Sequence, residues 1–300
     1  MLIDNAVSLE IKEKLGRVEL AGIFNYPIKS CGGQFLEEAE ITEFGIKDDR
    51  RAMIVDSGGS FITQREIPQL SQIRPSILGD VLTLSALGEP SSVDIPLTRE
   101  GINTQVRIWK DRVMAIDQGK DASDWLTGFL RKNGNRRYQT ETFRLVTMAE
   151  GVRRSFNQLY IQDSAMSVNF ADGFPFLIVS EESLEELNSR LADKLPMGRF
   201  RPNIVLKSPG SKIPHYEDYI KAVQIGGVAF DLVKPCARCP IPNTDPDTSV
   251  RTGEPLRTLI TYRWFQNKAG EFGAMFGQNA VHRNLGSINL KDPVQILEFN

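Results

Sequence analysis

The sequence predicts a mainly β protein with a few packed helices, an α+β chain folded as two successive β-barrel-like units. Three observations lead to this class. Short segments rich in β-branched and aromatic residues recur along the chain, separated by glycine or proline. A few longer segments carry apolar residues at helical spacing instead. The length of 300 residues is enough for two domains, which we expect to cover residues 18–140 and 141–300.

The first unit is expected to consist of short strands and one helix. Its strands are predicted at residues 18–28, 35–41, 51–56, 61–64, 81–84 and 104–108, with a hairpin turn at residues 57–60. The helix is predicted over residues 121–132, because its apolar residues share one helical face. These residues are Ala122, Trp125, Leu126, Phe129 and Leu130.

The second unit repeats this pattern. Strands are predicted at residues 143–148, 176–180, 203–207, around Val223 and at 228–232. A helix should follow the capping residue Ser180, since leucines recur at helical spacing at positions 184, 187, 191 and 195. Another helix is predicted from Pro255 to about Trp264. Turns are expected at residues 277–279 and 291–293.

Composition and charge exclude several classes of protein. Hydrophobic residues at 41%, charged residues at 25% and a net charge of -2 are ordinary for a soluble protein and argue against broad attraction to nucleic acid. Acidic residues near the N-terminus do not suit a signal peptide, and no segment has the length and apolarity of a membrane span. We therefore expect a cytoplasmic protein with neither nucleic-acid nor membrane partners.

The segment Lys234 to Thr248 carries the strongest functional signal. It lacks helical or strand periodicity, so we expect a shaped loop, and it contains two of the three cysteines, Cys236 and Cys239. The odd number of cysteines does not suit a disulfide framework. A zinc site, a dithiol redox pair, an inert turn and a thiolate ligand to a soft metal are all possible here. We favour the thiolate ligand, with Arg238 stabilising its deprotonated form.

Other polar clusters could support such a site. The residues Asp245 to Thr248 are good turn formers, and Asp245 or Asp247 could fix the cysteine loop or relay protons. Lys29 and Ser30 precede a Gly-Gly turn that could form a phosphate nest, although the order does not match a P-loop. Further cations flank predicted strands and suit phosphate or pterin binding, although surface ion pairs are the common alternative. They are Arg50, Arg51, Arg65, Arg199 and Arg201.

Several enzyme classes lack their motifs. The chain contains two histidines and shows no Ser-His-Asp arrangement, no G-x-G-x-x-G after a strand and too few cysteines for a four-cysteine iron–sulfur cluster.

Together these motifs resemble the MOSC family, in the two-part form of the amidoxime-reducing components, which places an N-terminal MOSC-associated β-barrel domain before the MOSC domain. The matching segments are YPIKSCGG at 26–33, DDRRAMIVD at 48–56, ITQRE at 62–66, FRPNIVL at 200–206, and PCARC at 235–239 followed by DPDT at 245–248. The sequence departs from these kin at Ala237, Pro242, Asn243 and Asn279.

The resemblance implies a molybdenum–molybdopterin cofactor. It assigns Cys239 as the metal ligand and six residues as cofactor contacts: Lys29, Ser30, Arg50, Arg201, Asn203 and Arg238. It also implies reduction of N-hydroxylated small molecules such as amidoximes, hydroxylamines or N-hydroxylated bases, with electrons from a separate flavin or iron–sulfur reductase. Asp245 is a candidate acid. The alternative functions are a carrier of the cofactor or of sulfur without turnover, and a zinc-stabilised interaction protein.

Overall fold

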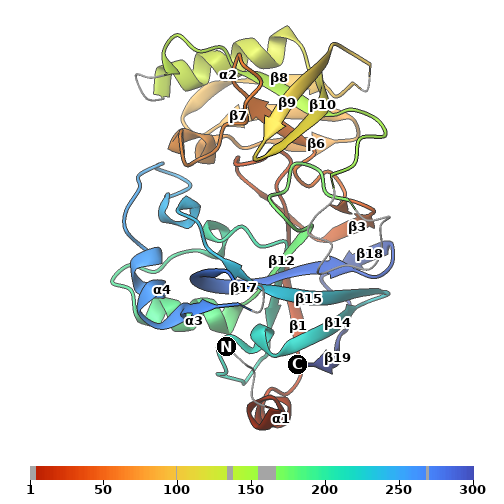
Figure 1. The fold of residues 1–300 in the computed structure, drawn as a ribbon, viewed down its shortest axis with the longest axis vertical. Helices are drawn as coiled ribbons and strands as arrows, with labels where there is room; N and C mark the ends of the chain where they lie inside the picture. The colour runs from red at the N-terminus through yellow and green to blue at the C-terminus, as the bar shows by residue number, and fades with distance from the viewer. Residues whose placement is uncertain (1–4, 99, 134–137, 155–166, 268–269) are drawn as a thin grey trace.

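The computed structural model describes residues 5–98, 100–133, 138–154, 167–267 and 270–300. Over these residues it contains nineteen strands and four α-helices arranged in two lobes (Figure 1). The predicted class, mainly β with packed helices, is therefore confirmed. The upper lobe in Figure 1 holds β6 to β10 and helix α2 (Lys120–Asn133), and the lower lobe is built on a nine-stranded sheet.

The nine-stranded sheet combines distant parts of the sequence. Its pairing order begins at β19 and ends at β2, and β16 pairs separately with β17. The strands in this order are β19 (Val294–Phe299), β14 (Ile220–Ile225), β15 (Val228–Ala237), β17 (Phe272–His282), β12 (Phe176–Ser180), β13 (Ile204–Lys207), β1 (Glu19–Asn25) and β2 (Gln34–Leu36), with β16 at Trp264–Gln266. Strand β1 thus lies beside β13, which comes more than 150 residues later, and β2 extends the same sheet by pairing with β1.

Three smaller sheets complete the molecule. One contains β5 (Ala52–Val55), β11 (Arg144–Met148), β10 (Asp111–Asp117) and β9 (Asn103–Ile108); another contains β6 (Ser76–Leu78), β7 (Val81–Ala86) and β8 (Glu89–Pro96); the third contains β18 (Gly286–Asn289), β3 (Glu38–Thr42) and β4 (Gly45–Ile46). The strand pairing therefore crosses the expected division at residue 140. Strand β11 joins a sheet of earlier strands, whereas β1 and β2 join later ones.

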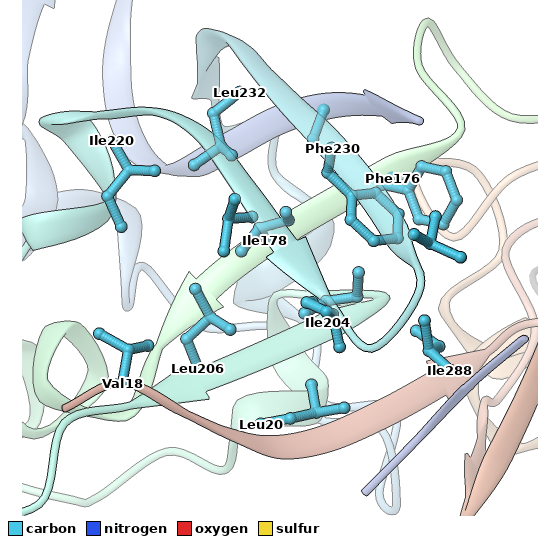
Figure 2. Close-up of a cluster of buried hydrophobic side chains, with 14 of the residues drawn as sticks. Val18, Leu20, Phe176, Ile178, Ile204, Leu206, Ile220, Phe230, Leu232 and Ile288 are labelled. Carbon is cyan, nitrogen blue, oxygen red and sulfur yellow. The ribbon is translucent and has the colours of Figure 1, made fainter. Parts of the chain in front are cut away.

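The core of the lower lobe lies against the nine-stranded sheet. Figure 2 shows Phe176, Ile178 and Phe230 among its buried side chains, together with Val18 and Leu20 from the start of the chain. The rings of Phe176 and Phe230 meet edge to face with their centroids 5.1 Å apart. Central strand β12 is buried on both sides, which explains its uninterrupted apolar sequence.

Helix α1 (Asn5–Lys14) was not predicted from the sequence. Its apolar residues do not form a clear helical stripe, so periodicity gave no signal. Ile11 near its end and Leu15 just after it are nonetheless buried in the core of the lower lobe. Tertiary burial therefore decides the structure of this segment, as it commonly does for short helices.

The predicted helices are present with small changes in their bounds. Helix α2 covers the upper core with the expected apolar face, and Trp125 stacks on Phe129 with ring centroids 5.6 Å apart. Helix α4 spans Leu256–Arg263. Helix α3 spans Glu181–Ser189, so the leucines at positions 191 and 195 lie beyond its end. As predicted, Ser180 is the N-cap of α3, and its side chain accepts a hydrogen bond from the Ser183 amide.

Three local predictions were wrong. Residues 277–279 lie inside β17 and form no turn. Gly277 has φ +76° there, and a Cβ atom would come within 2.7 Å of the Val179 side chain, so glycine is required by a close approach of strands. Lys234 to Ala237 continue β15 instead of opening a loop. Residues 61–64 form an isolated bridge between Phe61 and Val55 and no full strand.

The buried carboxyl of Glu217 supports the N-cap of α3 and makes stability depend on pH. It accepts hydrogen bonds from the hydroxyls of Ser180 and Ser183 at 2.7 and 2.8 Å. Burial raises the pKa of Glu217 from 4.5 to about 7. A carboxyl whose folded pKa is raised contributes stability below pH 4.5, and this contribution is lost as the pH rises through 7.

We expect Glu217→Gln to remove this pH dependence, because glutamine does not ionise. The free energy of unfolding of the unmodified chain should fall by at most about 3 kcal/mol between pH 5 and pH 8 through this residue. Urea unfolding of both proteins across this range measures the difference. The matched control is Glu185→Gln, because Glu185 is an exposed residue of helix α3, whose N-cap Glu217 supports. Parallel pH profiles of the Glu217→Gln protein and the unmodified chain would contradict the prediction.

Candidate functional site

A cavity of about 390 Å³ lies where the two lobes meet, lined by residues of both. Seven of the eight predicted site residues line it: Lys29, Ser30, Arg50, Arg201, Asn203, Arg238 and Cys239. The structure thus brings together positions that are up to 210 residues apart in the sequence. Asp245 is not among the lining residues, and the roles of the other seven remain predictions.

An aromatic ring holds two of these cations side by side. The guanidinium groups of Arg50 and Arg201 lie 4.5 and 4.1 Å from the ring centroid of buried Tyr26. The Tyr26 hydroxyl donates to the Pro202 carbonyl at 3.1 Å, and burial raises its pKa to about 12. A Cβ atom on Gly33 would come within 2.4 Å of this ring. The second glycine of the Gly-Gly turn therefore leaves room for Tyr26.

Burial and like charge destabilise the Arg201 cation. Its pKa is lowered to about 10, first by burial and then by the charge of Arg50. Arg201 donates to the Cys31 carbonyl, and Arg50 forms an ion pair with buried Asp49. The cavity wall therefore presents two adjacent guanidinium groups with one carboxylate behind them.

Four of the described lining residues have strained backbones: Trp109, with φ +54°, and three predicted site residues. Ser30, Arg50 and Arg201 have φ values of +67°, +46° and +57°, in the left-handed region that side chains rarely adopt. Such strain costs of the order of 1 kcal/mol per residue and gathers at functional sites. Among the described residues, the amide and hydroxyl of Ser30 donate no hydrogen bond, whereas the amides of Cys31 and Gly32 bind the Ile28 and Ile73 carbonyls. Of the predicted phosphate nest, therefore, only the donors of Ser30 remain available to an anion.

Asn203 joins the cavity to the large sheet. Its Oδ1 atom accepts from Arg50 at 3.1 Å and from the Leu177 amide at 3.3 Å, and its Nδ2 atom donates to the Phe24 carbonyl at 3.2 Å. These bonds use both acceptor sites of Oδ1 and one of the two donors of Nδ2. Asn203 therefore orients Arg50 and ties together strands β12 and β1.

Lys29 is anchored deep in the wall. Its Nζ atom donates to the Phe170 carbonyl at 2.9 Å and forms an ion pair with Asp172. Burial lowers the pKa of Lys29, and the Asp172 carboxylate opposes this effect. Burial alone would raise the pKa of Asp172, but the charge and hydrogen bond of Lys29 bring it well below its usual range. Buried Arg154 holds this segment by donating to the Ala171 carbonyl at 3.0 Å.

Two free cysteines line the cavity together. Cys236 and Cys239 are both partly buried, whereas Cys31 is fully buried and its pKa is raised to about 12 by burial. The Nη1 atom of Arg238 lies 3.2 Å from Cys236 Sγ. We expected this guanidinium to contact the ligand cysteine, Cys239, but the structure places it against Cys236. Its Nη2 atom donates to the Phe200 carbonyl at 2.7 Å. Its Nε atom is buried and has no hydrogen-bond partner in the part of the chain that the structure describes.

Another part of the wall carries an exposed ion pair. Lys234 Nζ lies 2.6 Å from the Glu271 carboxylate, which also accepts from Asn267 at 3.0 Å. The hydrogen bond from Lys234 is the main cause of the lowered pKa of Glu271. The Glu271 side chain is half exposed, so this pair connects the cavity with solvent.

Asp245 has a structural environment. Its Oδ1 atom accepts from the amides of Asp247 and Thr248 at 3.1 and 2.8 Å, as the turn interpretation predicts. Its Oδ2 atom lies 3.1 Å from Nη1 of Arg199, whose side chain is 3% exposed. These contacts favour the role of fixing the cysteine loop over that of a proton relay.

We expect Asp245→Asn to lower the free energy of unfolding by about 1–3 kcal/mol, because the buried Arg199 charge loses its partner. Activity per folded, metal-containing molecule should be unchanged. Denaturant unfolding and activity normalised to metal content measure the two effects. Asp247→Asn is the matched control, since Asp247 is exposed and pairs with Arg74 at the surface. A fall in normalised activity would instead support a proton relay.

Several wall residues were not predicted as site residues. They are Trp109, Asp172, Phe174, Lys234 and Glu271. For Lys234 a signal was available, because it lies two positions before Cys236 on one strand and therefore faces the same side. The others approach the cavity through tertiary contacts that no local pattern in the sequence reveals.

The described lining residues include six cations, at positions 29, 50, 65, 201, 234 and 238, and two carboxylates, at positions 172 and 271. This excess suits an anionic ligand, although the whole chain carries a net charge of -2. Within the described ranges no three His, Cys, Asp or Glu side chains are grouped as a metal site, so the zinc alternative lacks a ligand set. No described helix is long and apolar enough to cross a membrane.

Comparisons with known proteins agree with this arrangement. The models of the MOSC N-terminal beta barrel domain and the MOSC domain match residues 17–133 and 165–295. The chain is 34% identical to mitochondrial amidoxime-reducing component 1 of Mus musculus and 33% identical to that of Homo sapiens, in each case over 93% of this chain and 82% of the relative. It is 30% identical to molybdenum cofactor sulfurase of Oryza sativa subsp. japonica, over 87% of this chain and 32% of that protein. The chain therefore belongs to the MOSC family, in the form that joins a MOSC N-terminal domain to a MOSC domain.

Proposed function

We propose that this chain is a molybdenum-cofactor-dependent reductase of N-hydroxylated compounds, such as amidoximes, hydroxylamines and N-hydroxylated bases. Family membership and the names of its relatives, amidoxime-reducing components and a molybdenum cofactor sulfurase, point to a molybdenum-cofactor-associated function. The finer proposal is carried by one observation: the Cys239 thiol lines the same cavity as six cationic side chains. We further propose that a separate flavin or iron–sulfur protein supplies the electrons.

The residues of the cavity fit such a cofactor. Arg238 Nε is a buried donor that no described residue accepts from, and Ser30 offers an amide and a hydroxyl that no described residue uses. Arg50 and Arg201 are two like charges beside the same ring, so an anion between or beside them would relieve their repulsion. Phosphate oxygens would satisfy all of these groups.

Each residue can then be given a role. Cys239 would supply the thiolate, which suits a soft metal that is also bound by sulfur. The phosphate-bearing pterin would be held by Lys29, Ser30, Arg50, Arg201 and Arg238, with Asn203 orienting Arg50. When bound, the cofactor supplies the two-electron chemistry, and the protein supplies binding, orientation and electrostatics.

The reduction consumes two electrons and two protons for each N–O bond that is cleaved, and it releases water. The low pKa values of Asp172 and Glu271 keep both carboxylates ionised at neutral pH, so neither is a suitable acid. Lys234 carries protons on Nζ at the wall, and half-exposed Glu271 links it to solvent. We therefore assign proton delivery to Lys234 in place of Asp245.

Turnover by the purified protein tests this proposal. The chain is produced in a host that makes the cofactor, and benzamidoxime is supplied with reduced methyl viologen as an artificial electron donor. Formation of benzamidine, followed by chromatography, is expected only with the metal-containing protein. The alternative is a carrier of the cofactor or of sulfur, suggested by the match to the sulfurase. Stoichiometric cofactor transfer to an acceptor apoenzyme without any benzamidine would favour the carrier.

A further inference from the structure

The cavity wall contains aromatic surface that the cofactor-binding residues do not explain. Four aromatic side chains are among its described lining residues: Trp109, Phe174, Phe176 and Phe200. Phe176 and Phe200 are 1% and 0% exposed and belong to the hydrophobic cores. Trp109 is 43% exposed, and Phe174 is partly buried, so these two offer ring surface to a ligand.

The backbone at Trp109 is held in an unfavourable conformation. Residues 109 and 110 form the two-residue turn between β9 and β10, in which Ile108 pairs with Asp111. Trp109 occupies the first turn position with φ +54°, where glycine or asparagine is usual. A large aromatic residue at such a position destabilises the turn. Its presence is therefore better explained by its side chain than by its backbone.

The indole ring is fixed in place by polar contacts. Its Nε1–H donates to Asp172 Oδ1 at 3.1 Å, and the Arg65 guanidinium lies 4.8 Å from its ring centroid. The ring of Phe61 supports it with a centroid separation of 4.9 Å. Trp109 is thus rigid before any ligand arrives, which reduces the entropy lost on binding.

Phe174 reaches the same cavity from the other lobe. It lies two residues after Asp172, the carboxylate that holds both Trp109 and Lys29. The Lys234 ammonium lies 5.7 Å from its ring centroid, beside the Glu271 carboxylate. Phe174 therefore lies beside the part of the wall that we assign to proton delivery, and Trp109 lines the same cavity.

We propose that Trp109 and Phe174 form an aromatic recognition surface that selects planar aryl or heteroaryl N-hydroxylated substrates over aliphatic ones. A flat ring that stacks on an exposed indole buries apolar surface on both partners and gains further from the arrangement of the two rings. Stacking of this kind changes affinity by roughly 10-fold. This inference rests on the proposed reductase function and adds the substrate class.

The test compares benzamidoxime with acetamidoxime, which has the same reactive group but no ring. For the metal-containing Trp109→Ala protein, we expect the KM for benzamidoxime to rise about 10-fold, with the KM for acetamidoxime and both kcat values within about twofold of the unmodified protein. Trp109→Phe should restore most of the loss, and Phe174→Ala should show a smaller change in the same direction. Trp264→Ala is the matched control, because Trp264 is 53% exposed and does not line the cavity.

Binding without an electron donor separates this inference from the proposed function. Calorimetry of the metal-containing protein with each amidoxime measures affinity without turnover. A preference for benzamidoxime that Trp109→Ala abolishes supports the aromatic surface even if neither compound is reduced. Equal binding of the two compounds, or a preference that Trp109→Ala leaves intact, overturns it even if reduction is normal.

Discussion

Cys239→Ala is expected to leave the purified protein with little or no molybdenum and with activity at background. The thiolate that we assign as the protein's ligand to the metal is lost, and no described group of His, Cys, Asp and Glu residues could replace it. Elemental mass spectrometry of protein made in a cofactor-competent host should find near-stoichiometric molybdenum in the unmodified chain and at least a 10-fold loss in the variant.

Cys236→Ala is the matched control, because Cys236 is also a partly buried thiol in the cavity wall. Its sulfur accepts from Arg238, so its removal should shift this guanidinium and lower the metal content only mildly. Equal molybdenum in all three proteins would show that Cys239 is not the ligand. Zinc in place of molybdenum would favour the alternative function, a zinc-stabilised interaction protein.

Arg201→Ala is expected to produce a folded protein that retains little pterin. Arg201 is a partly buried cation beside Tyr26 and Arg50, and loss of a desolvated charged partner weakens anion binding by about 2–5 kcal/mol. This corresponds to at least about a 30-fold loss of cofactor affinity. Pterin content, measured by fluorescence after oxidative release from the protein, checks the result.

Two further variants define the origin of this loss. Arg201→Lys keeps the charge but not the planar fork, so it should retain an intermediate amount of pterin. Arg283→Ala removes an exposed arginine that pairs with Asp231 outside the cavity and should retain all of it. Full pterin content in the Arg201→Ala protein would mean that the cation cluster does not bind the cofactor phosphate.

Local signals in the sequence predicted individual elements well and their arrangement less well. The helix at 120–133 and strand β12 follow from apolar spacing and burial, which act over a few residues. The turn expected at Gly277 was wrong because glycine there serves a contact with Val179, about 100 residues away. Strand pairing crosses the expected division at residue 140 for the same reason, since β1 pairs with β13.

The site could be predicted where its residue types are informative in themselves. Cys239 and the arginines attract attention because a thiolate suits a soft metal and guanidinium groups suit phosphate. The sequence does not distinguish the two roles of Asp245, because an aspartate in a turn has the same sequence signature whether it caps the backbone or transfers protons. Trp109 and Glu271 enter the wall through a hairpin and a strand end whose positions depend on the complete fold.

The sheet that joins β1 to β13 has a consequence for biogenesis. Lys29 is translated more than 200 residues before Cys239. The strand that precedes Lys29 pairs with nearby β2 on one edge, but its other edge has no partner until residues 204–207 leave the ribosome. Contacts between such distant segments form slowly and leave strand edges exposed in the meantime. The nascent chain therefore lacks the complete cavity, and insertion of the proposed cofactor would be a step that follows translation.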